Sequence, residues 1–397
     1  MKRINIAHKR KNSKLNRILL IIHCLLRAIF FGPAKYKPQE VRRIIVVPSG
    51  KLGDVVCTTP VLHAIRTSLP KTTIIVAGQS GLHRSLLADS GLVDEYLDLD
   101  NEDAIENIKK SKVDAAIITG PSFMPAAQVY IAGVPLIIAA RVEGGISPSE
   151  TKPYKILQRF IKTFPYRMGE YAPRERLKSL EPLGIFFNDT KKHLAFSETA
   201  HNKVKQFFID HEVDINKDFV VGISPSAGNK IKEWPEDRFA KIADHLFEKY
   251  GAKIFITGGK GDVEKANEVI RCLDKKTFII DTSGKFSLDE LKAFMAKLKL
   301  FISVDSGPIY IAEAFNVPTI DIVGPMDEHE QPPIGPRHRV VVSIEREAPE
   351  MHILNAGGCD PDEVVRQVKA ISVDMVKLQI GDLISKELLL NCSSEYL

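Results

Sequence analysis

The stretch that most constrains the fold is residues 300–315, L-F-I-S-V-D-S-G-P-I-Y-I-A-E-A-F. Its first five residues form a short apolar run typical of a buried parallel strand, and residues 309–315 are apolar at helical spacing. The intervening Asp305-Ser306-Gly307-Pro308 combines capping residues, a glycine that permits close approach, and a proline suited to the first helical turn. The stretch therefore predicts a strand, a turn and a helix.

A helix that begins at the carboxyl end of a parallel strand directs its unpaired amides and positive dipole end into a cleft, where a phosphate or diphosphate can bind. Residues 300–315 therefore favour a nucleotide-sugar site. The same strand, turn and helix also serve as an ordinary connection in α/β proteins. Other segments must decide between these two interpretations.

The size and composition of the chain fit two globular domains. It has 397 residues, of which 44% are apolar and 26% charged, as in soluble proteins. The number of cysteines is odd, they are scattered, and they form no C-x-x-C motif, so neither a disulfide framework nor a zinc ribbon is indicated. A reducing compartment is expected. The cysteines are Cys24, Cys57, Cys272, Cys359 and Cys392.

The charge distribution separates a basic leader from an acidic body. Residues 1–43 contain twelve lysines and arginines and one glutamate, and since the whole chain carries +5, the remainder carries −6. Positive charge confined to a leader, without a folded aromatic platform, argues against nucleic acid as a partner.

Within residues 1–40, treated as a separate leader, an apolar segment is predicted to be an interfacial helix. Residues 18–31 would span about 21 Å as a helix, short of a hydrocarbon core of about 30 Å, and they include His23 and Arg27. We expect the helix to lie on an anionic membrane surface, with the protein cytoplasmic and peripheral at the inner face of the inner membrane. No small-x-small cleavage pattern supports a secretory signal. A helix packed on the body of the protein remains an alternative.

Residues 41–200 are predicted to form the first domain, an α/β unit with a parallel sheet. Gly50 and Gly53 open a tight turn after the first strand, and Asp54 stands at the start of the following helix. Neither G-x-G-x-x-G nor a P-loop motif is present, so Lys51 is not a P-loop lysine. Residues 147–171 are interpreted as a loop or lid. Strands are expected at 41–47, 73–77, 115–119 and 137–141, and helices near 81–88 and 173–180.

Residues 201–360 show the same alternation of predicted strands and helices and are predicted to form the second domain. Five strands are expected, at 219–223, 253–257, 277–281, 300–304 and 319–323, with a helix at 235–250. One closing helix is predicted at 361–378, within a carboxy-terminal segment of residues 361–397. The predicted fold is α/β, with two Rossmann-like doubly wound domains facing a central cleft.

Four ordered motifs resemble glycosyltransferase family 9, the ADP-heptose:lipopolysaccharide heptosyltransferases. They are K-L-G-D-V-V-C-T-T-P-V-L from Lys51, S-A-G-N-K-I-K-E-W-P-E-D-R-F from Ser226, G-G-K-G-D from Gly258, and D-S-G-P-I-Y-I-A from Asp305, followed by G-P-M-D. The resemblance spans about residues 44–380. It implies a GT-B fold, an acceptor-binding first domain, a donor-binding second domain, and inverting transfer without a metal or other cofactor.

The resemblance also implies a role for the first motif. Asp54 matches the general base, and Lys51 and Gly53 would meet the acceptor. An inverting displacement needs such a base on the acceptor hydroxyl and a stabilised diphosphate leaving group. The alternative for Asp54 is a helix cap, whose carboxylate is stabilised by the helix dipole and is a poorer base.

The second motif is expected to contact the donor diphosphate. Lys232 matches the family lysine, although the nearby Lys230 is an alternative. Ser224 and Ser226 would donate hydroxyls to phosphate or merely shape the turn. Trp234, the only tryptophan, is interpreted as a core anchor for the next helix.

The last motifs complete the expected donor site. Asp262, in the turn that begins at Gly258, would meet ribose hydroxyls or cap a helix. Ser306, Gly307 and Pro308 would seat the diphosphate, and Asp305 would shape the turn or contact the donor sugar.

One position departs from the family pattern. Tyr310 stands where histidine usually follows S-G-P, and tyrosine offers one neutral hydroxyl where histidine can carry a proton or a positive charge.

The sequence thus predicts an inverting glycosyltransferase that moves a sugar, heptose from ADP-heptose by the resemblance, to a lipopolysaccharide-core or other lipid-linked saccharide acceptor. Two alternatives remain. The first is a binding protein of the same fold that has lost transfer, which the residue at position 310 motivates. The second is a nucleotide-sugar epimerase, which would form its product without an acceptor.

Overall fold

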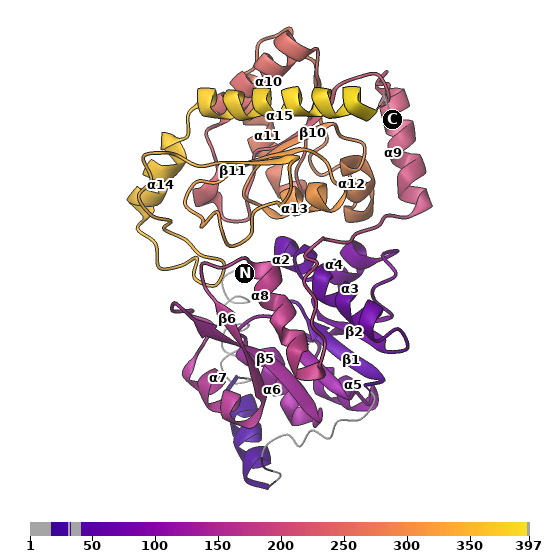
Figure 1. Cartoon of the computed structure of the whole chain (residues 1–397), viewed down its shortest axis with the longest axis vertical. Helices are drawn as coiled ribbons and strands as arrows, with labels where there is room; N and C mark the ends of the chain where they lie inside the picture. Colours follow the sequence, from indigo (N-terminus) through magenta and orange to yellow (C-terminus); the bar gives the residue numbers. More distant parts are fainter. Residues whose placement is uncertain (1–16, 31, 33–40, 395–397) are drawn as a thin grey trace, which may run out of the picture. The chain divides into compact units, whose positions relative to one another are not determined.

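The computed structural model describes residues 17–30, 32 and 41–394, which form two compact units (Figure 1). Of the described residues, unit 1 comprises those up to residue 50, residues 58–84 and residues 91–190. Unit 2 comprises residues 51–57, 85–90 and 191 onward. The short segment that follows the first strand therefore groups with the carboxy-terminal unit.

Unit 1 is built on a six-stranded, fully parallel sheet in the order β3-β2-β1-β4-β5-β6. Its central strands are continuous apolar runs, as expected where helices cover both faces of a sheet. The strands are β1 Arg43–Val47, β2 Thr73–Gly78, β3 Glu95–Asp98, β4 Ala115–Ile118, β5 Leu136–Glu143 and β6 Lys162–Arg167.

The helices that connect the strands of this sheet, or directly follow its last strand, are short. Tyr154 on α7 is fully buried and donates a hydrogen bond to the Ala140 carbonyl (2.6 Å), which fixes α7 against β5. The α-helices are α3 Thr59–Ser68, α4 Ser80–Leu87, α5 Ala104–Lys110, α6 Phe123–Ala132, α7 Lys152–Leu157 and α8 Ala172–Leu177, with 3-10 turns η1 Gln158–Phe160 and η2 Lys178–Leu183.

A further helix, residues 17–30, packs on unit 1 through one narrow face. Leu20 and Cys24 join the core formed by β1, β4 and α6, and Arg27 lies over the ring of Tyr130. This agrees with the helical prediction for this segment and with the alternative that it packs on the body. The rest of the predicted leader lies outside the described residues.

Unit 2 contains a second six-stranded parallel sheet, in the order β12-β11-β10-β7-β8-β9. Counted along the chain, both sheets have the strand order 3-2-1-4-5-6, which is that of a doubly wound Rossmann-like fold. The strands are β7 Val220–Ser224, β8 Lys253–Ile256, β9 Ile279–Asp281, β10 Leu300–Val304, β11 Thr319–Ile322 and β12 His338–Val341.

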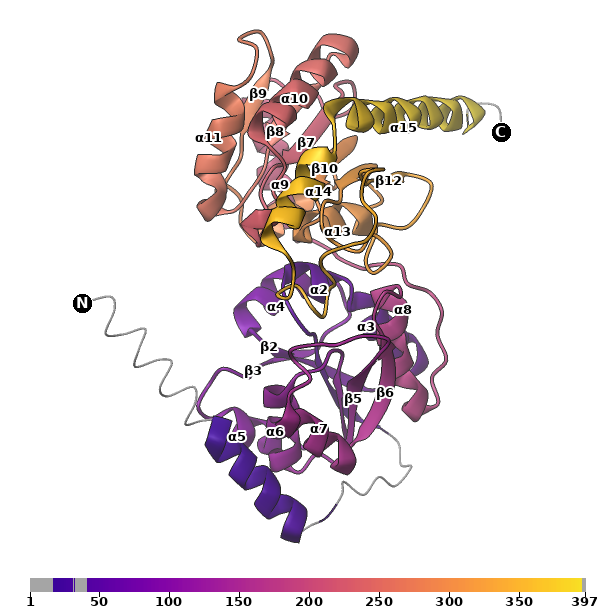
Figure 2. The ribbon, with the colours of Figure 1, turned by 90° about the vertical axis from the view of Figure 1, so that its left-hand side faces the viewer.

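The long helix α15 packs against α10 and the β11 and β12 strands, and α10 packs against α11 (Figure 2). Ser197, Ser287 and Asp360 cap α9, α12 and α14 with their side chains. The helices of unit 2 are α2 Leu52–Val56, α9 Glu198–Asp210, α10 Glu236–Tyr250, α11 Val263–Arg271, α12 Leu288–Met295, α13 Gly307–Ala314, α14 Pro361–Ala370 and α15 Val373–Ser394, with η3 Lys230–Lys232 and η4 Lys260–Asp262.

The prediction of a loop or lid at residues 147–171 was wrong, because this segment contains α7 and the edge strand β6. Along β6 the side chains of Phe164 and Tyr166 are buried and alternate with more exposed neighbours. Pro165 lies within the strand, which is tolerated at a sheet edge where one side needs no ladder bonds. The proline and the mixed polarity hid the strand pattern. The short strands β3 and β12 were also missed.

The prediction of one closing helix at residues 361–378 was wrong as well. Ile371 has an extended backbone between α14 and α15, and its carbonyl accepts a hydrogen bond from Trp234 Nε1 (2.9 Å). Apolar spacing continued across the break, so periodicity alone did not reveal it. Trp234 is fully buried, which confirms its interpretation as a core anchor.

Among the helices in the described part of the chain, none is both long enough and apolar enough to cross a membrane.

Candidate functional site

The candidate site lies at the carboxyl edge of the unit 2 sheet, where β7 and β10 are neighbours. The chain leaves these two strands toward opposite halves of the sheet, and this topological switch point is where doubly wound folds bind ligands. Ser224 ends β7, and Asp305 directly follows β10. Two of the sequence motifs therefore meet here.

Lys232 and Asp305, 73 residues apart in the sequence, make an ion pair at this edge. The Nζ atom of Lys232 donates to Asp305 Oδ2 at 3.0 Å and to the Asp305 backbone carbonyl at 2.6 Å. Both side chains are 14% exposed. Lys230 is exposed, so the structure favours Lys232 as the lysine of the site.

Tyr310 holds the other oxygen of the same carboxylate. Its hydroxyl donates a 2.5 Å hydrogen bond to Asp305 Oδ1, and its side chain is buried. Burial, followed by the carboxylates of Asp305 and Asp321, raises the pKa of the Tyr310 hydroxyl well above its usual value. Tyr310 is therefore a neutral hydrogen-bond donor at physiological pH and points at Asp305.

The start of α13 has the predicted form, with one difference. Ser306 is the N-cap residue and Pro308 lies in the first turn. The Ser306 hydroxyl makes no capping bond and lies instead 3.1 Å from the Ser303 hydroxyl. The helix start carries the partial positive charge typical of an anion site.

Glycines allow α2 to lie directly against this helix start. A Cβ atom added to Gly53 would come 2.9 Å from the Tyr310 ring, and one added to Gly307 would come 2.6 Å from a methyl carbon of Leu52. Real Cβ atoms essentially never make contacts that short, so a side chain at position 53 would have to displace the Tyr310 ring and one at position 307 would have to displace the Leu52 side chain. Gly53 thus contributes to close packing around the site.

Asp54, on α2, has a local bond in this structure. Its Oδ2 atom accepts a hydrogen bond from the backbone N–H of Lys51 (3.0 Å), as a residue at the third helical position does in a capping box. The Lys51 ammonium lies beside the loop after β7, 3.5 Å from where a Cβ of Gly228 would be. The first motif and the β7 loop thus come together within unit 2.

Three buried hydroxyls at successive strand ends make no hydrogen bond to described residues. Ser226 follows β7, Thr257 follows β8, and Ser283 follows β9. Unpaired buried hydroxyls are costly unless a ligand or water satisfies them, so this row marks a place for a polar ligand. The sequence analysis predicted Ser226 as a donor-binding residue but did not predict Thr257 or Ser283. Their signal was their position directly after predicted parallel strands.

The G-G turn after β8 is closed by Asp262. Its Oδ2 atom accepts from the Gly259 backbone N–H (2.7 Å), and a Cβ atom on Gly258 would come 2.8 Å from Asp262 Cβ. In this structure Asp262 therefore caps the turn, which was the alternative to a ribose contact.

The carboxyl group of Asp321, on β11, also lies at this site. The sequence analysis did not predict it. Its side chain is 1% exposed and its Oδ1 atom makes no hydrogen bond to described residues. Burial and then the Asp305 carboxylate raise the pKa of Asp321 well above its usual range, while Lys232 opposes the shift. Asp321 therefore lies within electrostatic reach of both members of the Lys232–Asp305 pair.

Comparison of the sequence with known families and proteins gives a consistent result. Residues 174–359 match the model of glycosyltransferase family 9 (heptosyltransferase). Lipopolysaccharide heptosyltransferase 2 of Escherichia coli (strain K12) is 20% identical over 75% of this chain and 87% of its own length. Lipopolysaccharide heptosyltransferase 3 of the same strain is 33% identical, over 40% of this chain and 45% of its own length.

Solved structures share the fold. A family 9 glycosyltransferase from Veillonella parvula DSM 2008 superposes with a TM-score of 0.70 at 21% identity, over 89% of this chain and 99% of its own. E. coli ADP-heptose LPS heptosyltransferase II gives a TM-score of 0.65 at 18% identity, over 87% and 99%. An E. coli heptosyltransferase with ADP-2-deoxy-2-fluoro heptose gives 0.60 at 15% identity, over 86% and 99%. The predicted GT-B fold is confirmed.

Proposed function

Because the chain belongs to glycosyltransferase family 9, we propose that it transfers heptose from ADP-heptose to a lipopolysaccharide-core or other lipid-linked saccharide, with inversion at the anomeric carbon. The observation that carries this proposal is the contact of Lys232 with Asp305 at the switch point. It puts a cation beside the start of α13, where a diphosphate would be held by both.

In the proposed reaction, a hydroxyl oxygen of the acceptor forms a bond to C1 of the donor sugar while the bond from C1 to the diphosphate oxygen breaks. Asp54 takes the proton of that hydroxyl. The departing diphosphate gains negative charge, which Lys232 and the start of α13 stabilise. No metal takes part in this scheme.

Other side chains have supporting roles in the proposal. Ser224, Ser226, Thr257 and Ser283 end or follow adjacent strands and would bond the phosphates and the nucleoside. Asp262 would exchange its turn bond for ribose hydroxyls. The ADP-2-deoxy-2-fluoro heptose named with the E. coli heptosyltransferase structure supports ADP-heptose as the first substrate to test.

The decisive experiment compares two neighbouring lysines. Product formation from ADP-heptose and a heptose-deficient lipopolysaccharide core is followed by mass spectrometry for Lys232→Met and, as the matched control, Lys230→Met. We expect kcat to fall about 10²- to 10³-fold for Lys232→Met, as when an electrostatic stabiliser of the transition state is removed. Lys230→Met should stay within about twofold, since an exposed side chain away from the ion pair does not stabilise the transition state.

Equal loss in both variants would contradict the role given to Lys232. A product that forms from the donor without any acceptor would favour an epimerase. Donor binding with neither transfer nor hydrolysis would favour a binding protein.

We also propose that the helix of residues 17–30 binds an anionic membrane surface, which would place the enzyme at the inner face of the inner membrane near its lipid-linked acceptor. Away from its packed face, its apolar side chains are exposed: Ile18 54%, Leu19 44%, Ile22 45%, Leu25 47%, Leu26 46%, Ile29 75% and Phe30 75%. A contiguous apolar face of this kind marks an interaction surface. The basic residues around it in the sequence complement anionic lipid.

Co-sedimentation with vesicles tests this surface. The protein should bind vesicles that contain phosphatidylglycerol, and less so at 0.5 M NaCl or with phosphatidylcholine alone. Leu25→Glu should weaken binding about tenfold, whereas Ile146→Glu, at an apolar side chain that is 80% exposed elsewhere in unit 1, should not. Concentration-dependent dimerisation that Leu25→Glu abolishes, without vesicle binding, would assign the face to a second copy of the chain.

A further inference from the structure

A buried carboxyl group lies beside the ion pair of the candidate site. Asp321, on β11, is the register partner of Ser303 on β10, and Ser303 is in turn the partner of Ser224 on β7. Register partners in neighbouring strands direct their side chains to the same face of the sheet. The backbone N–H of Asp305 bonds to the carbonyl of Ile322 (3.3 Å), the residue after Asp321. The carboxyl group therefore belongs to a polar row at the switch point.

The face of the sheet that carries Asp321 is opposite to α15. Its neighbours along β11, Ile320 and Ile322, belong to the apolar core that includes residues of α15. Side chains alternate between the two faces along a strand, so Asp321 points to the other face. Two α13 side chains agree with this placement: Asp321 raises the pKa of Tyr310, and Glu313 raises the pKa of Asp321.

The carboxyl group of Asp321 has no bonding partner within the described part of the chain. The residue is 1% exposed, and its Oδ1 atom makes no hydrogen bond there. A carboxylate removed from water without a partner is costly, and such a group takes up a proton more readily. Burial, followed by the Asp305 carboxylate, raises the pKa of Asp321 well above its usual value, while Lys232 lowers it.

We propose that Asp321 is a positioning residue for Lys232, and that its protonation directs the lysine toward the donor diphosphate. This inference rests on the function proposed above. With Asp321 ionised, two buried carboxylates attract the Lys232 ammonium. With Asp321 protonated, the ammonium has only the Asp305 carboxylate beside it, at 3.0 Å, and more of its attraction acts on a diphosphate at the start of α13.

The coupling also acts in the opposite direction. A diphosphate at the start of α13 brings negative charge next to Asp305, and negative charge raises the proton affinity of a nearby carboxyl group. Donor binding and protonation of Asp321 therefore reinforce each other, because linked equilibria are reciprocal. Donor affinity should be highest below the pKa that Asp321 has in the free protein and should fall as the pH rises through that value.

The other titratable groups near Asp321 have partners of their own. Tyr310 donates to Asp305 at 2.5 Å. The Oε1 atom of Glu313 accepts from Lys192 Nζ at 2.7 Å, in an ion pair whose side chains are 9% and 0% exposed. Glu313 thus has a cation that is separate from Lys232. The groups that act on Asp321 or on its neighbour Tyr310 are Asp305, Lys232, Tyr310, Glu313 and Cys57.

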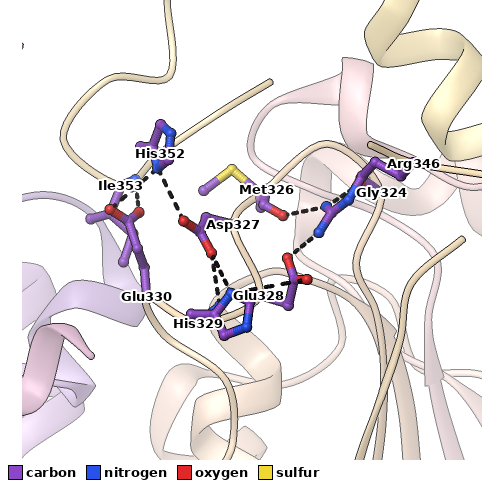
Figure 3. Close-up of polar contacts among 9 residues, drawn as sticks. All are labelled: Gly324, Met326, Asp327, Glu328, His329, Glu330, Arg346, His352 and Ile353. Carbon is purple, nitrogen blue, oxygen red and sulfur yellow. Dashed lines mark hydrogen bonds and ion pairs between the residues drawn. The ribbon is translucent and has the colours of Figure 1, made fainter. Parts of the chain in front are cut away.

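The charged side chains of the loop that follows β11 bond within their own cluster (Figure 3). Arg346 pairs with Glu328 and donates to the backbone carbonyls of Gly324 (2.9 Å) and Met326 (2.7 Å). This arginine is therefore committed to the loop, and Lys232 is the cation that lowers the pKa of Asp321. The titratable members of the cluster are Asp327, Glu328, His329, Glu330, Arg346 and His352.

Isothermal titration of the full-length protein with ADP-heptose, without acceptor, tests the coupling between pH 5.5 and 9.5. The diphosphate of this ligand is esterified at both ends, so it does not titrate in this range. Asp321→Asn has the shape of the protonated acid and cannot ionise. We expect the ratio of the wild-type Kd to the Asp321→Asn Kd to rise about fivefold or more from the lowest to the highest pH.

The matched control is Asp382→Asn, in α15. This carboxylate is 40% exposed and pairs with Lys386 and Arg339, so its loss should leave the pH profile of the Kd parallel to that of the wild type. Circular dichroism confirms that each variant is folded.

Proton uptake supplies a second measurement that needs no variant. Titrations of the wild type in buffers with different heats of ionisation should show protons taken up on binding, in the pH range where the Kd changes. Absence of uptake at every pH, or the same pH profile in wild type and Asp321→Asn, would overturn the coupling alone. Absence of ADP-heptose binding at every pH would overturn the proposed donor as well.

Discussion

Tyr310 and Lys232 donate hydrogen bonds to different oxygens of the Asp305 carboxylate. The tyrosine hydroxyl lies 2.5 Å from Oδ1 and the lysine ammonium 3.0 Å from Oδ2. Asp305 thereby fixes both the lysine and the first turn of α13. The tyrosine that departs from the family pattern is thus a positioning residue in this structure, because it touches the carboxylate and is itself buried. Its hydroxyl donates a hydrogen bond to the carboxylate without adding a charge to the site.

Tyr310→Phe should lower both stability and turnover. It keeps the ring but removes the bond to Asp305, so we expect the free energy of unfolding to fall by about 1 to 3 kcal/mol, as for a lost hydrogen bond to a charged group. The loosened carboxylate should also lower kcat on the order of tenfold. Denaturant unfolding and transfer assays measure the two effects, and Tyr310→His, which retains a donor, serves as the rescue variant. A Tyr310→Phe protein with unchanged kcat would show that the hydroxyl is structural alone.

Asp54→Asn should abolish most transfer while leaving donor binding intact. The asparagine oxygen can still accept the Lys51 N–H, so the helix start is preserved, but the amide cannot take a proton. We expect kcat to fall about 10²- to 10⁴-fold, the range for loss of a general base, with the Kd for ADP within twofold by calorimetry. Asp360→Asn, at the N-cap of α14, is the matched control for a cap without a catalytic role. Near-normal turnover of Asp54→Asn would leave Asp54 with its capping role only.

His338 should make the protein less stable in mild acid. Burial, followed by the charges of Lys192, Arg337 and Arg339, lowers the pKa of His338 from 6.5 to about 4. The unfolded state therefore binds more protons between these values, so the stability is present above pH 6.5 and is lost as the pH falls toward 4. The free energy of unfolding that is lost through His338 is on the order of 3 kcal/mol.

Urea unfolding between pH 4 and 7 measures the effect. His338→Asn, whose side chain can still meet Thr319 Oγ1 as Nδ1 does at 2.8 Å, should flatten this part of the pH profile. The exposed His23, changed to Asn, should leave the profile unchanged. An identical slope in wild type and His338→Asn would mean that other groups cause the acid sensitivity.

Trp234→Phe should destabilise unit 2. The indole is fully buried, packs edge-on against Phe239 and bonds the Ile371 carbonyl between α14 and α15. The smaller ring leaves a cavity and removes one of the two side-chain hydrogen bonds to the Ile371 carbonyl, the other being from Arg238, so we expect a loss of about 2 to 3 kcal/mol. Circular dichroism must follow unfolding, since the only tryptophan is removed. Phe186→Ala, at a side chain that is 81% exposed, should change stability by less than about 0.5 kcal/mol.

The predictable parts of the fold were those with strong local signals. The strand at 300–304, the helix start at Ser306-Gly307-Pro308 and the anchoring role of Trp234 agree with the structure. The strand β6 was not predictable, because its proline and mixed polarity hide the alternating pattern of a strand. The helix break at Ile371 was not predictable either, because it contains no proline and the apolar spacing continues across it. The choice of Lys232 over Lys230 required knowing which side chain reaches Asp305.

The α/β class, the two doubly wound halves and the order of the motifs could be predicted from the sequence alone, because apolar periodicity and turn residues act over a few neighbouring positions. The groups that meet across the fold could be identified from the structure alone: Lys232 with Asp305, and the hydroxyls of Ser226, Thr257 and Ser283 along one sheet edge. The physical reason is that such contacts depend on strand order and loop paths, which bring together residues that no local pattern connects.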